Sequence, residues 1–326
     1  MNNAGALLSK LGVRLIQLSV VFVVVTFFTV SLISLVPGKP ENLVIPFDGT
    51  AEQTQRAEFR KKNDLDQPLP IRWARWAKRF VSGDMGNTYS STGSSPVSDK
   101  VKDAAPISGL LILYTQVVAL AISIPLAILA AYRNNTWVDK VISTLAFGAL
   151  SLPSFAVAIV LSYFFGVQLG WVKTSGYNPL GDGLALHLKS VAVPVIALSL
   201  GQIAVYMRLL RSDLVATLQE DFILMAKSKG ISSRRVLWRH ALRPSSLTLL
   251  TVIGLNVGNL IGGTIVVEVL FSIPGMGKEI GAAILGRQYV ALQSYVALIA
   301  IFFVLLNFLV DYLYTVLDPR IRERGA

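Results

Sequence analysis

Six long stretches of this sequence contain no charged side chain, and they constrain the fold more than any other feature. Each is long enough, or nearly so, to supply the roughly 20 apolar residues that a helix needs to cross a bilayer. Charged residues make up 15% of the chain, against roughly 25% in a soluble domain. The sequence therefore predicts an all-α membrane protein. The charge-free stretches lie between Arg14 and Lys39, Asp103 and Arg133, Lys140 and Lys173, Lys189 and Arg208, Arg243 and Glu268, and Arg287 and Asp311.

We predict six transmembrane helices within a single transmembrane domain, residues 1–326. The first is expected to be a membrane helix, because its apolar run exceeds the about 7–15 residues of a signal peptide. The fourth is the shortest. Long loops, residues 37–104 and 208–245, are expected on opposite sides of the membrane. The predicted spans are about 15–36, 105–131, 141–166, 190–207, 246–270 and 294–316.

Lys and Arg are distributed unevenly between the two sides. The N-terminal segment, the 133–140 loop, the 208–245 loop and the C-terminus share one side and are rich in basic residues. Short loops rich in Lys and Arg stay in the cytoplasm. Both termini are therefore expected in the cytoplasm and residues 37–104 outside it. The net charge of +11 follows from this topology and requires no nucleic acid.

The outer loop contains an amphipathic helical pattern. One face comprises Trp73, Trp76, Ala77 and Phe80, and the other comprises Arg72, Arg75, Lys78 and Arg79. We expect this helix to anchor at the membrane surface. A surface that docks another protein is the alternative.

The sequence of the 208–245 loop predicts a helix, then a turn at a glycine, then a second short helix. Gly230 is placed to end the first helix, and Ser232 or Ser233 is placed to cap a second helix over residues 236–241. Such a unit offers a compact surface to the groove of a partner, although the positive charge alone would follow from topology. The apolar positions that predict the first helix are Leu214, Leu218, Phe222 and Met225.

The chain lacks the residues of a catalytic centre. The segment Gly275–Lys278 resembles part of a phosphate-binding loop, but Ser272 replaces its first glycine and Glu279 replaces the Ser or Thr that holds magnesium. We therefore expect no enzyme activity and no ATP hydrolysis by this chain. Cysteine is absent, and the two histidines, His187 and His240, fall on opposite sides, so no metal site is expected.

The predicted span interiors contain no ionisable residue, and Glu268 and Asp311 lie at span ends. Proton-coupled carriers place such groups inside the membrane, so this class is disfavoured, while sodium coupling stays open. In the fifth span, Gly254, Gly258 and Gly262 form a stripe of small residues that allows close helix packing. Asn256 and Asn259 lie on another face. Helix packing and lining of a translocation path are both open interpretations of these five residues.

The chain resembles the membrane permease subunits of binding-protein-dependent ABC importers, in the form typical of oligopeptide and dipeptide permeases. The stretch DFILMAKSKG at 221–230, continuing to Arg243, is similar to the "EAA" loop of that family. The chain departs from the family pattern at Lys39, at Asn63-Asp64, in the run after Arg287 and at Pro244, which leaves the subfamily and substrate open. Further similar motifs, in the family's order, are LVPGKP at 35–40, LDQPLP at 65–70, GDMGN at 83–87, SLPSF at 151–155, FSIPGMG at 271–277 and LDPR at 317–320.

The resemblance implies a type I ABC importer permease fold in a bacterial plasma (inner) membrane, with a long extracytoplasmic first loop. It implies a homologous second permease, two cytoplasmic ATPase subunits that bind ATP and Mg²⁺, an extracytoplasmic solute-binding protein and a peptide substrate. Nickel, glutathione and antibiotic peptides stay open as cargo. A stand-alone ion-coupled carrier or channel, and a docking scaffold, are the competing functional classes.

The resemblance also assigns the coupling residues. The coupling helix of the family corresponds to Asp221–Gly230, flanked by Ile231–Val236, and would sit in a groove of one ATPase. In this assignment Gly230 sets the corner and Ala226 permits close approach. The residues assigned to ATPase coupling are Asp221, Ala226, Lys227, Lys229, Gly230, Ser233, Arg234 and Val236.

Overall fold

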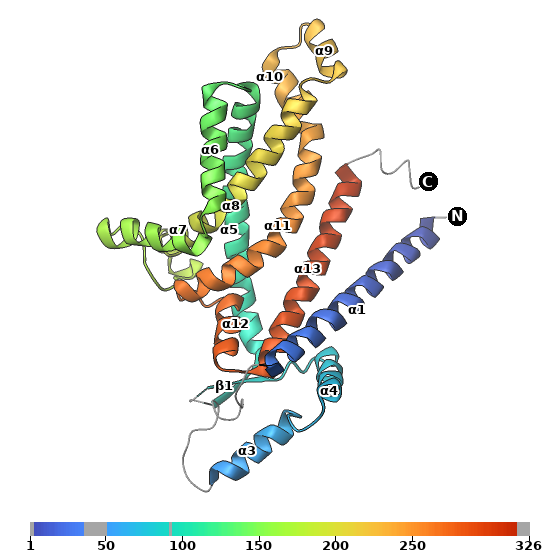
Figure 1. The fold of residues 1–326 in the computed structure, drawn as a ribbon, viewed down its shortest axis with the longest axis vertical. Helices are drawn as coiled ribbons and strands as arrows, with labels where there is room; N and C mark the ends of the chain where they lie inside the picture. The colour runs from blue at the N-terminus through green and yellow to red at the C-terminus, as the bar shows by residue number, and fades with distance from the viewer. Residues whose placement is uncertain (1–2, 36–50, 91–92, 318–326) are drawn as a thin grey trace. The chain divides into compact units, whose positions relative to one another are not determined.

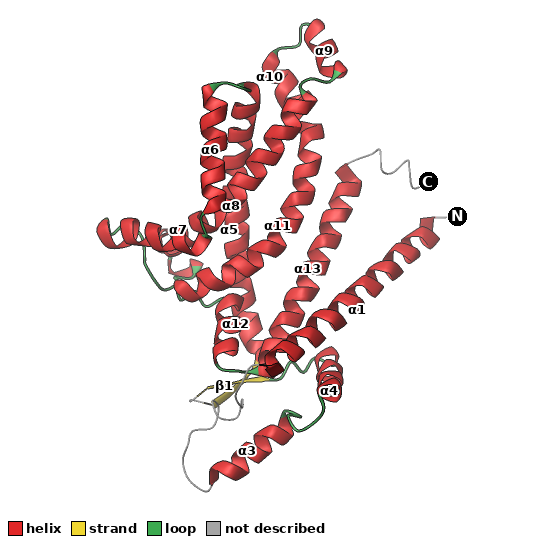
Figure 2. Cartoon of the chain, in the orientation of Figure 1, coloured by secondary structure: helices red, strands yellow, loops and turns green. Residues whose placement is uncertain are grey.

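The computed structural model describes residues 3–35, 51–90 and 93–317, and these are almost entirely helical (Figures 1 and 2). Most of the motif at 35–40, most of that at 317–320, and Lys39 lie outside the described residues. The helices are α1 (Asn3–Leu35), α3 (Ala51–Lys62), α4 (Leu69–Val81), α5 (Val97–Tyr132), α6 (Trp137–Ser151), α7 (Ser154–Leu161), α8 (Leu184–Thr217), α9 (Asp221–Ser228), α10 (Ser233–Arg235), α11 (Leu242–Leu270), α12 (Met276–Leu285) and α13 (Tyr289–Leu317). Strands β1 (Asn87–Ser90) and β2 (Gly93–Pro96) form an antiparallel hairpin, and η1 (Ser162–Gln168), η2 (Leu180–Asp182) and η3 (Val236–Ala241) are short π- or 3₁₀-helical segments.

Four of the described helices are long and apolar enough to cross a membrane: α5, α8, residues 248–270 of α11 and residues 289–310 of α13. In α1, residues 16–32 form a shorter apolar stretch. The all-α class is confirmed. The helix at the fourth predicted span, 190–207, is longer than predicted, because α8 has 34 residues and includes Lys189 and Arg208, the two charges that bound this stretch.

The third predicted span, 141–166, is not one straight helix. The α6–α7 pair is bent by 99° at a short break, and counts as a fifth candidate span only if the two halves are taken together. Leu152 is extended, with φ −99° and ψ 124°. The cause is Pro153, because a proline ring excludes the helical conformation from the residue before it. The chain therefore leaves α6 at Ser151 and starts α7 in a new direction.

The chain divides into two compact units, which we describe separately. Unit 1 comprises residues 1–107 and 274–308. Its core holds the apolar face of α4, where Trp76 is 2% exposed and Phe80 8%. Trp76 stacks on Phe22 of α1 and donates to Ser294 of α13 at 3.0 Å. The expectation that this face anchors in the membrane surface is therefore wrong: the protein itself covers it.

The basic face of α4 is held by local polar contacts. Asp64 accepts from Arg75 at 2.7 Å and from Arg79 at 3.0 Å. Arg72 donates to Ser34 of α1 at 2.5 Å, and partial burial lowers the pKa of its guanidinium. Elsewhere in unit 1, the side-chain amide of Gln288 bonds to both the backbone N–H and the carbonyl of one β1 residue, which ties the start of α13 to the hairpin.

Unit 2 comprises residues 108–273 and 309–326, and its core lies between α5, α6, α8, η3 and α11. Small side chains such as Ala127 and Ala204 let the helices approach closely. Tyr206 of α8 is fully buried and donates to Gln116 of α5 at 2.9 Å. Within this unit, α9 and α10 lie beyond the ends of α8 and α11, at the opposite end from α7 (Figure 1).

Candidate functional site

The helix expected to run through Leu214 and Met225 is two helices. The first, α8, ends at Thr217, and a turn closed by hydrogen bonds from Gln219 to Ala216 and from Glu220 to Thr217 follows it. Glu220 is extended, with ψ 149°, so α9 starts afresh at Asp221. The prediction of one continuous apolar face is therefore wrong, because the bend rotates α9 relative to α8.

This rotation turns large apolar side chains of α9 outward. Phe222 is 47% exposed, Leu224 52% and Met225 61%. Ile223 and Ala226 point the other way and join the core of unit 2, where they are 0% and 7% exposed. We define the outer face of α9 as Phe222, Leu224 and Met225. It is an apolar surface on a helix whose opposite side packs into the core of unit 2.

Gly230 ends this unit as predicted. Its φ of +77° is in the left-handed region that favours glycine. Its N–H donates to Lys227 at 2.9 Å, and the N–H of Ile231 donates to Ala226 at 3.2 Å. These two bonds form a Schellman motif, which satisfies carbonyl groups at the helix end. A Cβ at Gly230 would meet nothing within 4 Å, so the backbone angle, not space, is what calls for glycine.

The second helix starts at Ser233 with Ser232 at the N-cap position, although no side-chain cap hydrogen bond forms. It does not stop at residue 241, as predicted, but continues through η3 into α11. Pro244 lies in the first turn of α11, directly after the π-helical segment η3. A hollow of about 420 Å³ on this segment is lined by Ser232, Arg234, Arg235, Trp238 and Arg239.

The structure sorts the predicted coupling residues into two groups. Ala226 and Val236 are buried in the core of unit 2, so they pack the loop against that core and do not form its outer surface. The others are exposed around the outer face of α9 and the start of α10: Asp221, Lys227, Lys229, Gly230, Ser233 and Arg234.

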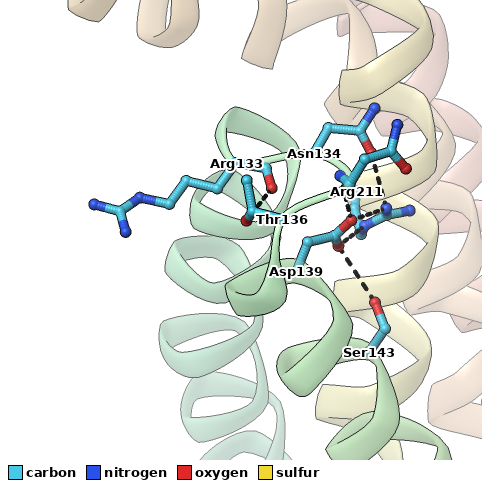
Figure 3. Close-up of polar contacts among 7 residues, drawn as sticks. Arg133, Asn134, Thr136, Asp139, Ser143 and Arg211 are labelled. Carbon is cyan, nitrogen blue, oxygen red and sulfur yellow. Dashed lines mark hydrogen bonds and ion pairs between the residues drawn. The ribbon is translucent and has the colours of Figure 1, made fainter.

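The structure adds a partly buried ion pair that sequence reasoning missed. Asp139, in the first turn of α6, is 3% exposed and binds Arg211 of α8 through both carboxylate oxygens (Figure 3). Asn134, in the turn between α5 and α6, accepts from the same guanidinium at 3.1 Å. In the sequence, Arg211 counts only among the basic residues of the 208–245 loop, and Asp139 has no predicted role. A pairing across 72 positions leaves no signal in a single sequence.

The glycine stripe of α11 splits into different environments. A Cβ at Gly254 would come within 2.5 Å of Val310 in the same unit, so this glycine permits close packing. Gly262 is exposed and has nothing within 4 Å, while Gly258 and Asn256 are half-buried. Asn259 is exposed and donates to Asn256 at 3.5 Å. Close helix packing within unit 2 therefore accounts for a glycine at position 254. It does not account for the glycine at position 262 or the asparagine at position 259.

Asn259 lines a cavity of about 200 Å³ in unit 2. The cavity lies against the α6–α7 break, and Ser154, at the start of α7, contributes to its wall. Gln202 of α8 also lines it, and the side-chain oxygen of Gln202 is buried without a hydrogen-bond partner among the described residues. Three polar side chains from three helices thus meet at this cavity, whose other lining residues are mainly apolar: Ala149, Leu150, Leu152, Val157, Ala197, Leu198, Leu200, Gly201, Leu260 and Gly263.

Two further polar residues of unit 2 are fully buried near the ends of long helices. Glu268 lies near the end of α11, as predicted, and accepts from Ser108 of α5 at 2.6 Å. His187, in the first turn of α8, contacts the carbonyl oxygen of Asn178 at 2.7 Å through Nδ1 and packs edge-on against Tyr177. Burial raises the pKa of Tyr177. The Glu268 bond joins α11 to α5, and the His187 contacts hold the loop before α8 against that helix.

The long apolar helices are those of a multi-pass membrane protein, and the loop between α8 and α11 presents exposed side chains. A family model described as "Binding-protein-dependent transport system inner membrane component" matches residues 123–323, and the chain belongs to this family. It is therefore a transporter permease subunit, the membrane component of an ATP-driven ABC importer of the peptide and nickel group.

Curated relatives match over nearly the whole chain. A putative peptide transport system permease protein of Brucella abortus (strain 2308) is 34% identical over 309 residues, covering 95% of this chain and 97% of the relative. A probable peptide ABC transporter permease protein of Sinorhizobium fredii is 32% identical, with the same coverage. A nickel import system permease protein of Staphylococcus aureus (strain USA300) is 35% identical over 310 residues, covering 95% of this chain and 90% of the relative.

Proposed function

We propose that this chain forms half of the translocation path of a peptide importer and receives the movement of an ATPase through residues 221–236. The observation that carries the proposal is the outer face of α9. Phe222, Leu224 and Met225 expose about half of their side chains in a loop rich in basic residues. A short helix that presents a few apolar anchors is suited to a groove on a partner. The exposed Lys227 and Lys229 would meet the rim of that groove.

In this proposal the chain crosses the membrane six times as a single domain, residues 1–326. The shorter apolar stretch of α1 and the bent α6–α7 pair join the four long helices as spans. In this proposal the 208–245 loop and both termini lie in the cytoplasm, which the many basic residues of that loop support. The 37–104 loop is then extracytoplasmic and is the segment offered to a solute-binding protein.

The proposed partners follow from the class. Two ATPase subunits bind ATP and Mg²⁺ and close on each other, a homologous permease supplies the second half of the path, and a solute-binding protein delivers the cargo. The ATPases would favour one of two arrangements of the helices, which is alternating access. The cavity lined by Ser154, Gln202 and Asn259 is our candidate for a polar site that contacts the cargo along the translocation path. Its three side chains can both donate and accept hydrogen bonds, as a peptide backbone requires.

Peptide is the first candidate cargo, since relatives named as peptide permeases cover the chain end to end. Nickel is the second candidate, because the nickel import relative has the highest identity of the three, 35%.

The test is reconstitution in proteoliposomes. The chain is assembled with its sister permease, the two ATPases and the binding protein, and uptake of radiolabelled di- and oligopeptides is compared with uptake of ⁶³Ni²⁺. We expect ATP-dependent peptide uptake by the full assembly and none by this chain alone. Flux through the chain alone, without ATP, would support a channel or ion-coupled carrier and overturn the proposal. Uptake of nickel and not peptide would change the cargo and keep the mechanism.

A further inference from the structure

The Asp139–Arg211 pair joins two elements at one end of unit 2. Arg211 donates through Nε and Nη2 to the two carboxylate oxygens, each at 2.5 Å. The backbone N–H of Asn135 donates to the same carboxylate at 3.0 Å, and Ser143 of α6 approaches it at 3.4 Å (Figure 3). The carboxylate is thus held by α8, by the α5–α6 turn and by α6 at once.

The geometry of this contact fixes orientation as well as distance. A guanidinium that binds both oxygens of a carboxylate through two parallel bonds resists rotation, which a single point charge would not. A second contact lies further along the same two helices, where Arg208 of α8 stacks over the ring of Phe147 of α6 at 4.3 Å. The α6 and α8 helices are therefore attached at two separated points, and neither can turn freely against the other.

The pair also lies between two sites of the proposed function. Arg211 is about 9 Å from the end of α8, at 1.5 Å per residue, and α9 follows after one turn. At its other end, α6 leads to the break at Pro153 and the cavity lined by Gln202 and Asn259. A displacement of α9 that reaches α8 would be passed by the pair to α6, and by α6 to the wall of that cavity.

We propose that Asp139 and Arg211 are a positioning pair for transport, which makes α8 and the α5–α6 turn move as one body when an ATPase moves α9. The inference rests on the proposed docking of an ATPase at α9. Stability alone does not account for the pair, because the side chain of Arg211 stays 25% exposed and ion pairs that remain in contact with water contribute little to folding stability. What an ion pair of this geometry provides is a defined orientation between two helices.

The experiment uses the complete importer in proteoliposomes, and the readout is the number of peptides taken up per ATP hydrolysed. In Asp139→Asn, Arg211→Gln and the double variant, we expect the ATPases to stay bound and to hydrolyse ATP. Uptake per ATP should fall about tenfold, within the range seen for residues that couple distant sites. The double variant should be no worse than either single variant, because both remove the same contact. Lys140→Gln, an exposed charge change beside Asp139, is the matched control and should transport normally.

A covalent replacement separates positioning from folding. The chain has no cysteine, so Asp139→Cys with Arg211→Cys carries its only thiols when cysteine-free partners are used. A short bis-maleimide that joins them should raise uptake per ATP several-fold over the same protein with each thiol blocked singly. Arg211→Lys, which keeps the charge and loses the fork, should fall between wild type and Arg211→Gln. If the other variants do not fold and insert in the membrane, the uptake per ATP of Arg211→Lys tests the positioning role.

Three results would overturn the inference. The first is an unchanged ratio of uptake to ATP in Asp139→Asn. The second is a cross-linked protein that gains nothing over its singly blocked form. The third is loss of ATPase binding in Asp139→Asn, since the pair would then shape the docking surface and not transmit its movement. Failure of the proposed function is a different result: the ATPases would stay bound after the outer face of α9 is truncated.

Discussion

Truncating the outer face of α9 is the most direct test of where an ATPase binds. Phe222, Leu224 and Met225 are replaced together by alanine. Because all three side chains point away from the core, the fold of unit 2 should not change. Ile223, between them, is fully buried and is left intact, so α9 keeps its anchor.

The expected magnitude follows from the exposed fractions of 47, 52 and 61%. Full burial of an exposed Phe, Leu or Met contributes about 1.5–3 kcal/mol, so the half that is still exposed represents about 1 kcal/mol per residue. If an ATPase groove covers all three, their loss costs about 2–3 kcal/mol, which corresponds to a roughly 30- to 150-fold weaker complex. Uptake should fall in proportion at ATPase concentrations near the Kd.

The assay is a binding titration of purified ATPase subunits against the two permeases in nanodiscs, followed by uptake. Ile71→Ala with Val81→Ala is the matched control, because these residues are 44% and 80% exposed on α4, in the predicted extracytoplasmic loop. The control should bind the ATPases normally. A triple variant that is well folded, and whose Kd lies within about threefold of wild type, would refute the assignment of the docking surface to α9.

Three other substitutions test single contacts. Gly230→Val forces a β-branched residue to a φ of +77°, so we expect a local cost of about 1–3 kcal/mol and reduced ATP-dependent uptake at normal membrane insertion. Gly254→Leu drives a side chain into Val310, and overpacking of about 1–3 kcal/mol should lower the thermal stability measured in detergent. Trp76→Ala empties a site that is 2% exposed and should destabilise unit 1 by about 3–5 kcal/mol, read as the unfolding transition or as protease sensitivity of the outer loop.

Each of these has a control on the same element. Gly230→Asn should be milder than Gly230→Val, since asparagine tolerates the left-handed region. Gly262→Ala should be neutral, because nothing lies within 4 Å of the added methyl group. Trp76→Phe keeps most of the buried area and loses the bond to Ser294, so it should cost about 1 kcal/mol. If a substitution and its control gave the same result, the contact named for that substitution would not be the cause of the effect.

Much of the fold was readable because bilayer helices depend on local composition. The charge-free stretches located the long helices, and Gly230 marked the end of α9, since only a left-handed residue closes a Schellman motif there. The break at Pro153 was readable in principle. The restriction that a proline places on the preceding residue is local, but the apolar run continues across it and predicts a single span.

The rest could not be read because it depends on contacts between distant residues. No glycine or proline marks the turn between Thr217 and Asp221, and the burial of Ile223 decides which face of α9 points outward. The apolar face of α4 is indistinguishable in sequence from a membrane-surface anchor. Only the position of Trp76 against Phe22 and Ser294 shows that protein covers it.

The way in which α9 is held bears on its proposed role. A helix of 8 residues is too short to be stable alone in water, where helices below about 12–15 residues are marginal. Its shape is therefore imposed by Ile223 and Ala226 below it and by the turn at Gly230 after it. A surface whose shape is fixed before binding spends less free energy on ordering when a partner binds. The same rigidity means that a force applied to Phe222 and its neighbours reaches the core of unit 2 with little lost in local bending. A flexible loop with the same exposed residues would bind an ATPase and transmit little of its movement.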